Sequence, residues 1–227
     1  MTHYSIAVDG PSGAGKSSLS RKLAESLGFI YADTGAIYRT VGLAAHRRGI
    51  DCKDGSAVCA MLPDIKIELR YNAEGEQRMY LDGEDVSREI RLPEISICAS
   101  DVSALPQVRE YLMQMQRGLA ESSNVIMDGR DIGTVVLPNA SLKIFLTASS
   151  EARARRRLLE LQAKGVETDF ESVLRDINYR DEQDSSRDAA PLKVAEDAVI
   201  VDTSNIDFEE SFRLMRSIIC ERLGIEA

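Results

Sequence analysis

Residues 10–17 read GPSGAGKS and match the pattern G-x-x-x-x-G-K-[ST]. The motif directly follows a short apolar segment at residues 5–8 and opens an amphipathic segment at residues 16–27, so it stands between a predicted strand and a predicted helix. Its glycines allow backbone N–H groups to wrap around a phosphate, and the N-terminus of the following helix adds the positive end of its dipole. We therefore predict that this loop binds a nucleoside triphosphate.

Three side chains extend the predicted nucleotide site. Lys16 supplies a compact positive charge for the β and γ phosphates, and the hydroxyl of Ser17 can ligate Mg²⁺. Asp128 ends the apolar segment 124–127, where a carboxylate can stand near the metal. The alternative is that Asp128 only caps the turn at Gly129; we favour the metal role and leave both open. The chain contains no Asn-Lys-x-Asp motif for reading guanine, which disfavours a GTPase.

The segments on either side of the loop predict an α/β fold. Short apolar segments at residues 5–8, 29–32, 124–127, 142–147 and 198–201 read as five strands. Helical patterns follow them, among them residues 16–27, which stop at Gly28, and residues 36–48, which stop at Gly49. The last helix carries Phe208, Phe212, Met215 and Ile219 on one face. Strands that alternate with helices indicate a parallel sheet covered on both faces.

The middle of the chain breaks this alternation. Residues 65–71 and 79–86 alternate apolar with polar side chains, and turns at residues 72–75 and 82–83 separate them. This pattern predicts a small antiparallel meander, followed by helices near residues 94–104 and 106–121. We interpret the meander and its helices as an insertion into the α/β core. The alternative is that the meander extends the main sheet.

Composition narrows the range of partners. Of the 227 residues, 44% are hydrophobic and 29% are charged, which are values of a globular protein and exclude wholesale disorder. The net charge of −9 argues against general binding to nucleic acid or to anionic membranes, because both are negatively charged. The 28 basic residues comprise 21 Arg and 7 Lys. Arginine suits bidentate contacts to phosphate, but on the count alone we favour genome composition and exposed ion pairs as the explanation of this excess.

The cysteines and the lack of long apolar runs point to a cytoplasmic protein. Cys52, Cys59, Cys98 and Cys220 form no C-x-x-C pair, and with no export signal in the sequence we expect reduced thiols that serve as packing residues. A zinc site is not expected, since His3 and His46 stand far from paired cysteines. No apolar run is long enough to span a bilayer, so we expect no membrane partner.

Several further motifs resemble those of bacterial cytidylate kinases. They are DTGAIYR at residues 33–39, DGRDIGTVV at 128–136, KIFL at 143–146, the Arg-rich residues 151–158 and APL at 190–192. The resemblance covers nearly the whole chain and implies the P-loop nucleoside-monophosphate kinase fold. That fold has a core (residues 1–32, 106–150 and 189–227) with a parallel five-stranded sheet, an NMP-binding insertion with a small antiparallel sheet (33–105) and a helical lid (151–188).

The same resemblance implies a set of site residues. Arg39 and Arg130 match positions that grip the acceptor phosphate, and Arg109 and Asp131 match positions near cytosine; without the resemblance, Arg109 and Ser100 read as ordinary polar residues of a helix surface. Lys16, Arg39 and Arg130 are the expected catalytic residues. The expected CMP-binding residues are Thr34, Arg39, Ser100, Arg109, Arg130, Asp131, Arg180, Asp184 and Arg187. The expected ATP-binding residues are Gly10, Pro11, Ser12, Gly13, Ala14, Gly15, Lys16, Ser17, Ser18, Arg153, Arg156 and Arg157.

Residue spacing supports part of this set. Arg180, Asp184 and Arg187 fall at i, i+4 and i+7, which places them on one helical face, where Asp184 can hold both guanidinium groups. Residues 153, 156 and 157 share a face in the same way. For both groups the alternative is a solvated face of exposed ion pairs, worth only a few tenths of a kcal/mol.

The expected reaction is transfer of the γ-phosphoryl group of Mg·ATP to CMP or dCMP. The acceptor phosphate is already an oxyanion, so positioning and charge neutralisation suffice and no nucleophilic side chain is required. We expect a monomer that binds Mg²⁺, ATP and CMP or dCMP and no nucleic acid. Three alternatives stay open: a kinase for UMP, AMP or a non-nucleotide acceptor, a nucleotide-hydrolysing switch, and an ATP-binding adaptor without activity.

Overall fold

The computed structural model describes residues 3–163, 165–187 and 190–225. Contacts between residues divide the chain into two compact units, Met1–Phe29 with Asn124–Ala227 and Ile30–Ser123. The predicted division into core, insertion and lid stays a prediction. Among the described residues, no helix has both the length and the apolar character needed to cross a membrane.

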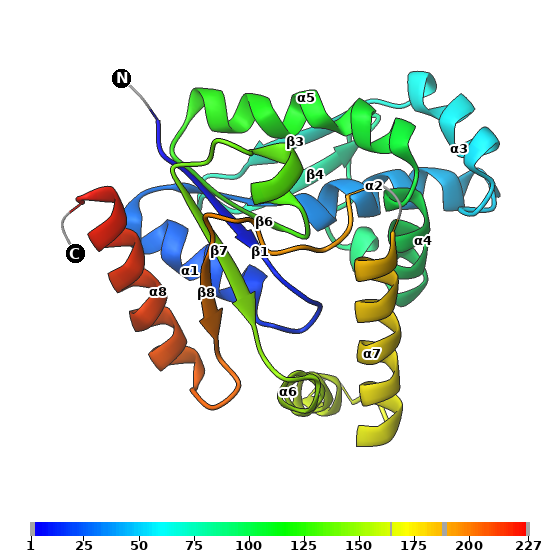
Figure 1. The fold of residues 1–227 in the computed structure, drawn as a ribbon. Coiled ribbons are helices and arrows are strands. Elements are labelled where there is room, and N and C mark those ends of the chain that lie inside the picture. Colours follow the sequence, from blue (N-terminus) through cyan, green and yellow to red (C-terminus); the bar gives the residue numbers. More distant parts are fainter. Residues whose placement is uncertain (1–2, 164, 188–189, 226–227) are drawn as a thin grey trace. The chain divides into compact units, whose positions relative to one another are not determined.

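The parallel sheet has the strand order β2-β6-β1-β7-β8. Four of these strands, all except β2, lie in the first unit (Figure 1). The strands are β1 (Ser5–Asp9), β2 (Ile30–Asp33), β6 (Val125–Gly129), β7 (Leu142–Thr147) and β8 (Val199–Asp202). β1 pairs in parallel with β6 and β7, and β7 pairs in parallel with β8. The side chains of Ile6, Val8 and Ile126 are fully buried, as expected for central strands covered on both faces. The predicted five-stranded sheet is confirmed.

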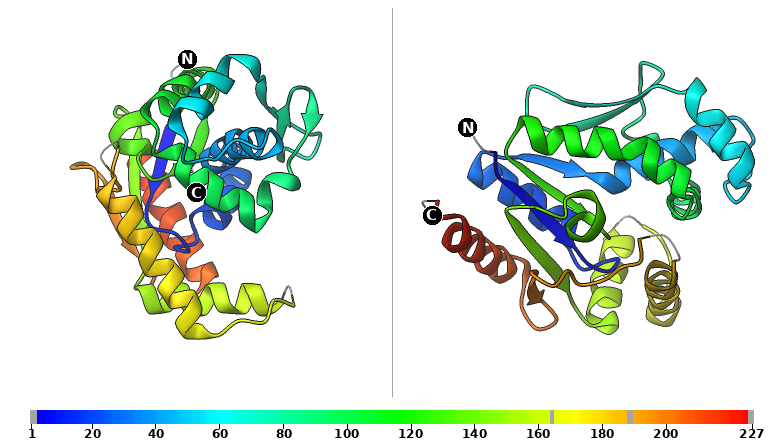
Figure 2. Two further views of the ribbon diagram at one scale, coloured as in Figure 1. Left: turned by 90° about the vertical axis from the view of Figure 1, so that its right-hand side faces the viewer. Right: turned by 45° about the horizontal axis from the view of Figure 1, so that its top comes forward.

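Four helices of the first unit follow from local sequence signals. They are α1 (Lys16–Leu27), α6 (Ser150–Ala163), α7 (Phe170–Ser186) and α8 (Phe208–Leu223). α1 ends at Gly28, which has the left-handed conformation that favours glycine, and α8 begins with a capping box between Asp207 and Glu210. α6 and α7 lie against each other and bury Ala154, Val173 and Ile177 in a small core of their own (Figure 2).

The segment after β6 differs from the sequence prediction. Instead of a regular helix, the chain forms one π-helical turn at Ile132–Val136. The carbonyl of Asp131 accepts from the amides of Val135 and Val136 at 2.9 and 3.2 Å, and Ile132 O accepts from Leu137 N. Such turns often occur at functional sites, and this one directly follows the DGRD motif.

The second unit is built from helices around a separate small sheet. Its helices are α2 (Thr34–Arg47), α3 (Gly55–Met61), α4 (Pro93–Ser103) and α5 (Pro106–Ser122), with 3₁₀ turns at Leu62–Asp64 and Glu89–Arg91. The sheet has the antiparallel order β3 (Ile67–Tyr71), β4 (Gln77–Leu81), β5 (Glu84–Asp85). The predicted meander is thus confirmed, and the alternative that it extends the main sheet is wrong. The sequence analysis missed α3, which is only seven residues long.

One core holds this unit together. Ile37 and Leu43 of α2, Met79 of β4, Ile95 of α4 and Leu112 of α5 are all buried in it. Each helix contributes an apolar stripe, and the meander contributes one face, which explains its period-two pattern. The unit therefore presents α2, α4 and α5, which carry predicted CMP-binding residues, on a well-packed scaffold.

Candidate active site

The phosphate loop has the backbone conformation that the motif predicts. Gly10, Gly13 and Gly15 all have positive φ, at +148°, +76° and +90°. At Gly10 a Cβ atom would lie 1.9 Å from the carbonyl oxygen of Leu146, so only glycine fits between β1 and β7 at this point. Gly15 leads into α1 in the left-handed conformation without a side-chain cap. Gly15 has no side chain that could accept from the first backbone N–H groups of α1. An anion site at the start of a helix requires N–H groups that no cap side chain occupies.

Lys16 is folded back over this loop. Its ammonium group is buried and donates to the carbonyl oxygens of Gly10 and Pro11 at 2.7 and 2.8 Å. Burial, and next the positive charge of Arg130, lower the pKa of Lys16 to about 7, while nearby carboxylates act in the opposite direction. A polyanion at the loop would restore the charged form, because it replaces weak carbonyl partners by full negative charges.

The residues at the start of α1 and the end of β6 fit a magnesium ion. Ser17 Oγ lies 2.8 Å from Oδ2 of Asp128, which is 4% exposed. A hydroxyl and a carboxylate are ligands that Mg²⁺ accepts, and the ion keeps several waters and phosphate oxygens besides. No group of three His, Cys, Asp or Glu side chains that could hold a metal occurs among the described residues. The metal role of Asp128 stays a prediction.

Arg130 and Asp184 come together although 54 residues separate them. Arg130 Nε donates to Asp184 Oδ2 at 2.5 Å, and both side chains are mostly buried. Both also act on the pKa of Lys16, which places this ion pair within electrostatic reach of the phosphate loop. A predicted acceptor residue therefore lies near the predicted donor site within the first unit.

The contacts of α7 correct one prediction. Asp184 pairs with Arg130 rather than with Arg180 or Arg187. α7 ends at Ser186, so Arg187 lies beyond the helix and donates to the carbonyl of Ala190 at 3.1 Å. The spacing i, i+4, i+7 fails here because the backbone of Arg187 leaves the helical conformation. Arg180 lies within α7 and is exposed.

The three arginines of α6 that are predicted to bind ATP have different surroundings. Arg153 is buried and forms a bidentate pair with Asp181 of α7 at 3.0 and 2.6 Å, while its guanidinium also donates to Ser12 O of the phosphate loop at 3.0 Å. Arg156 binds Thr203 and the carbonyl of Ile206 after β8. Arg157 is exposed and pairs with Glu160. A solvated helix face thus describes only Arg157, because the other two bridge segments of the first unit.

In the second unit, Arg39 is held at the start of α2. Asp33 caps α2 by accepting from the amide of Ala36 at 2.9 Å, and its other oxygen accepts from Arg39 at 3.0 Å. Nε of Arg39 is buried and has no hydrogen-bond partner among the described residues. Thr34, the first residue of α2, is buried as well. This guanidinium is therefore oriented by Asp33 and keeps a donor for a further acceptor.

Arg109 and Ser100 differ in burial. Arg109, on α5, is 5% exposed, donates to the carbonyl of Ser103 at 3.2 Å and stands 5.7 Å from the ring centre of Tyr38. The helix-surface interpretation of Arg109 is therefore wrong. Ser100 is exposed on α4, as that interpretation expects. Asp131, in the first unit, is buried directly before the π-helical turn.

Sequence reasoning missed three carboxylates that orient predicted site residues or loops. Asp33 holds Arg39, Asp181 holds Arg153, and Asp9 accepts from two backbone amides after Arg130. Asp9 and Asp33 are the last residues of β1 and β2. Asp9 and Asp33 could have been predicted from the sequence, because each is a carboxylate at the end of a strand and directly before a functional motif. The sequence contains no such indication for Asp181.

The buried carboxylate of Asp9 gives a testable pH dependence. Burial raises its pKa from 3.8 to about 6, although the amides of Gly133 and Ile132 oppose this shift. Because the folded-state pKa lies above the unfolded value, the stabilising effect is complete below 3.8 and is lost as the pH rises through 6. The loss amounts to about 3 kcal/mol of unfolding free energy. Urea unfolding should therefore show that stability falls over this range in the wild type but not, to the same extent, in Asp9→Asn; parallel curves would contradict the expectation.

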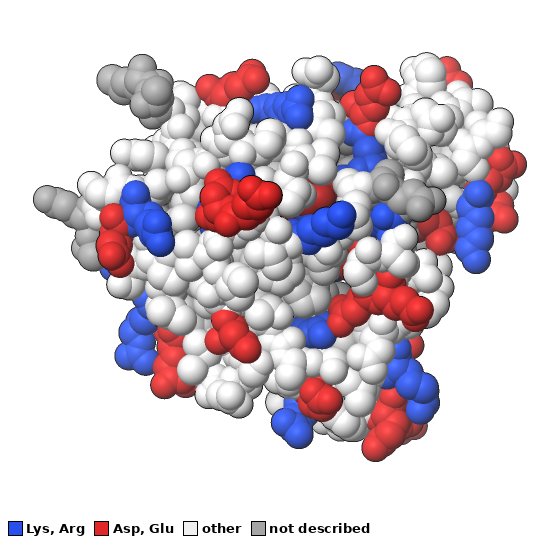
Figure 3. All heavy atoms as spheres, viewed as in Figure 1, with Lys and Arg blue, Asp and Glu red and all other residues white. Residues whose placement is uncertain are grey.

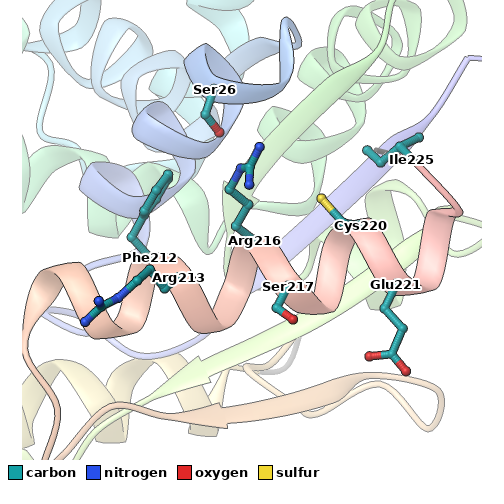
Figure 4. A pocket seen from close by; sticks show the side chains of 8 residues that line it. All are labelled: Ser26, Phe212, Arg213, Arg216, Ser217, Cys220, Glu221 and Ile225. Carbon is teal, nitrogen blue, oxygen red and sulfur yellow. The ribbon is translucent and has the colours of Figure 1, made fainter. Parts of the chain in front are cut away.

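A pocket in the first unit lies apart from these residues. Figure 4 shows Phe212 and Arg216 of α8 pointing toward the part of α1 that carries Ser26, with Cys220 and Ile225 further along the pocket. None of the predicted site residues lines it. The pocket is thus no part of the candidate site.

The parallel sheet and the glycine-rich loop between β1 and α1 define a P-loop nucleotide-binding protein. The sequence profile of cytidylate kinases matches residues 6–219. The chain belongs to the cytidylate kinase family.

Two cytidylate kinases align with this chain over most of their own length. A cytidylate kinase from Caldicellulosiruptor bescii is 50% identical over 210 residues, 92% of either chain. One from Caldicellulosiruptor saccharolyticus is 47% identical over 226 residues and the full length of both. Among solved structures, shikimate kinase from Bacteroides thetaiotaomicron aligns over 98% of this chain and 99% of its own at 13% identity and a TM-score of 0.48. The family assignment rests on the sequence matches.

Proposed function

We propose that the chain transfers the γ-phosphoryl group of ATP to CMP or dCMP and releases ADP and CDP or dCDP. The observation that carries this proposal is the match to cytidylate kinases over the whole chain, 47% identity over 226 residues in one case. The phosphate loop, the buried Lys16 and the ion pair of Arg130 supply the chemistry that such a transfer needs. The enzyme would act in pyrimidine nucleotide metabolism.

The donor side of the reaction belongs to the loop and the start of α1. Backbone N–H groups of residues 10–18 other than Pro11 hold the ATP phosphates, and Lys16 moves from its two carbonyl partners to the β and γ phosphates. Ser17 and Asp128 hold Mg²⁺, directly or through water, and the bound ion neutralises charge on the phosphates. Arg153, Arg156 and Arg157 belong to the proposed lid, and Arg153 already reaches the loop at Ser12.

The acceptor side needs positive charge for the CMP phosphate and a mixed set of donors and acceptors for cytosine. Arg39 and Arg130 bind the phosphate, each charge-assisted hydrogen bond contributing about 1.5–3 kcal/mol. Arg109 and Asp131 read the base, because cytosine presents an amino donor beside ring nitrogen and carbonyl acceptors. The remaining contacts of the nucleoside are assigned to Thr34, Ser100, Arg180, Asp184 and Arg187.

A panel of acceptors tests the proposal. ADP release is measured with Mg·ATP and CMP, dCMP, UMP, AMP or shikimate in turn, and without acceptor. The proposal expects fast turnover with CMP or dCMP and little without an acceptor. Turnover that favours AMP or shikimate would overturn the substrate assignment. Hydrolysis independent of acceptor would indicate a switch, and ATP binding without any turnover would indicate an adaptor.

Magnesium dependence gives a second expected outcome. Chelation by EDTA should abolish transfer, and Asp128→Asn should raise the Mg²⁺ concentration for half-maximal rate by about tenfold, since the substituted amide binds the ion or its waters more weakly. Asp207→Asn, which removes a carboxylate charge at the start of α8, serves as the matched control. An unchanged Mg²⁺ requirement in Asp128→Asn would remove this residue from the metal site.

We also propose a cytoplasmic monomer without a nucleic-acid partner. On the face shown in Figure 3, basic and acidic side chains of the described residues are interspersed, which accords with the net charge of −9. Size-exclusion chromatography with light scattering should give a mass near 25.0 kDa; a dimer mass would contradict the monomer.

A further inference from the structure

Asp9 binds the backbone that follows Arg130 and Asp131. It is the last residue of β1, and its side chain is buried. Oδ1 accepts from the amide of Ile132 and Oδ2 from the amide of Gly133, both at 2.7 Å. Both oxygens of one carboxylate thus hold two consecutive peptide units, and charge-assisted bonds of this kind are short and strong.

The same peptide units are also confined on their other side. A Cβ atom on Gly133 would lie 3.0 Å from Cδ of Lys143 and 3.3 Å from Oδ2 of Asp9. Lys143 is itself held, because its ammonium group pairs with Asp197 at 2.8 Å. The backbone at Gly133 therefore lies between a carboxylate and a lysine stem, and a methyl group there would make one of these neighbours shift.

Holding a charge at this position is costly, which argues for a role beyond packing. Burial raises the pKa of Asp9, and the nearby carboxylate of Asp131 raises it further, whereas the two amides and Lys16 favour the ionised form. An apolar side chain would avoid this penalty, but it would leave the amides of Ile132 and Gly133 without their acceptor. Groups that cost stability and keep a perturbed pKa beside a site are typical of functional positions.

We propose that Asp9 is a positioning residue of the acceptor site: its carboxylate orients the peptide units of Ile132 and Gly133 and thereby fixes Arg130 and Asp131, which directly precede them, for CMP binding. This inference rests on the proposed function. Asp9 touches neither substrate. The role of Asp9 differs from that of the phosphate loop, although the loop follows Asp9 directly in the sequence. Lys16 donates its hydrogen bonds to Gly10 and Pro11 and interacts with Asp9 only through charge.

The test is steady-state kinetics of Asp9→Asn and Gly133→Ala with CMP, together with equilibrium binding of ATP. In Asp9→Asn one amide faces an NH₂ group in place of an oxygen, while Gly133→Ala moves the same backbone with Asp9 intact. We expect kcat/KM for CMP to fall about 10- to 100-fold in both variants, because a misplacement near 1 Å costs this much. The dissociation constant of ATP should change less than about threefold, since Lys16 makes its hydrogen bonds to Gly10 and Pro11 and interacts with Asp9 only through charge. Asp207→Asn is the matched control, because it removes the same charge from a carboxylate that also accepts a hydrogen bond from a backbone amide. Its kcat/KM for CMP and its dissociation constant for ATP should equal those of the wild type.

Each result decides one point. If the wild-type protein does not phosphorylate CMP, the proposed function is wrong, and the positioning role of Asp9 in that reaction is overturned with it. Wild-type activity together with unchanged CMP kinetics in both variants would overturn the positioning role alone. An equal loss of ATP and CMP binding would assign Asp9 to the phosphate loop or to general stability instead. If Asp9→Asn does not fold, Gly133→Ala gives the same split between ATP and CMP.

Discussion

Lys16→Met should lower kcat for CMP phosphorylation about a thousandfold, because a preorganised charge at the migrating phosphoryl group is lost. Methionine has a similar length and no charge, so the volume of this buried position is nearly kept. The carbonyl groups of Gly10 and Pro11 lose the donor that Lys16 supplies. We therefore expect a larger effect on turnover than on the unfolding free energy.

Lys22→Met is the matched control for this variant. Lys22 lies on the same helix, pairs with Glu209 and stands over the rings of Phe208 and Phe212. Its loss should leave kcat unchanged and cost at most about 1 kcal/mol of stability. Stopped-time assays of ADP formation with saturating CMP measure both variants. A Lys16→Met enzyme with a tenth or more of normal turnover would contradict the proposed role.

Arg130→Ala is expected to lower kcat/KM for CMP about a hundredfold or more, since two charge-assisted contacts to the acceptor phosphate are lost. ATP binding should be affected much less. Arg213→Ala, at an exposed position on α8, is the matched arginine control and should behave as the wild type. Near-normal phosphorylation of CMP by Arg130→Ala would exclude it from the site.

A double-mutant cycle separates the two partners of Arg130. Arg130 Nε lies 2.5 Å from Asp184 Oδ2 in the structure. In the proposed complex, the guanidinium of Arg130 binds the CMP phosphate instead. Asp184→Asn alone should reduce kcat/KM less than Arg130→Ala, and the double variant should lose less than the two single losses combined, because the two side chains are paired. Strictly additive losses would show that Asp184 acts without Arg130, for example on the sugar hydroxyls only.

Local patterns predicted most of the fold. The apolar segments, the stop at Gly28, the meander and the phosphate loop all depend on neighbouring residues. The predicted bounds of the strands differ from the observed ones by at most two positions. Predictions failed where a segment was short or irregular: α3 has seven residues, and the turn after Asp131 is π-helical. The helix spacing of Arg187 failed because α7 ends one residue earlier.

The candidate site divides in the same way. The sequence alone determined the donor loop, because its glycines, Lys16 and Ser17 are adjacent and the loop's conformation follows from positive φ at three glycines. Only the tertiary structure paired Arg130 with Asp184, buried Arg109 and brought Asp9 to the amides of Ile132 and Gly133. These contacts join residues far apart in the chain or depend on how neighbouring elements pack, and periodicity describes only one element at a time. The predicted phosphate-binding loop is therefore a local property of this chain, because its residues are adjacent. The orientation of the charged side chains of the candidate site depends on the packing of the whole chain.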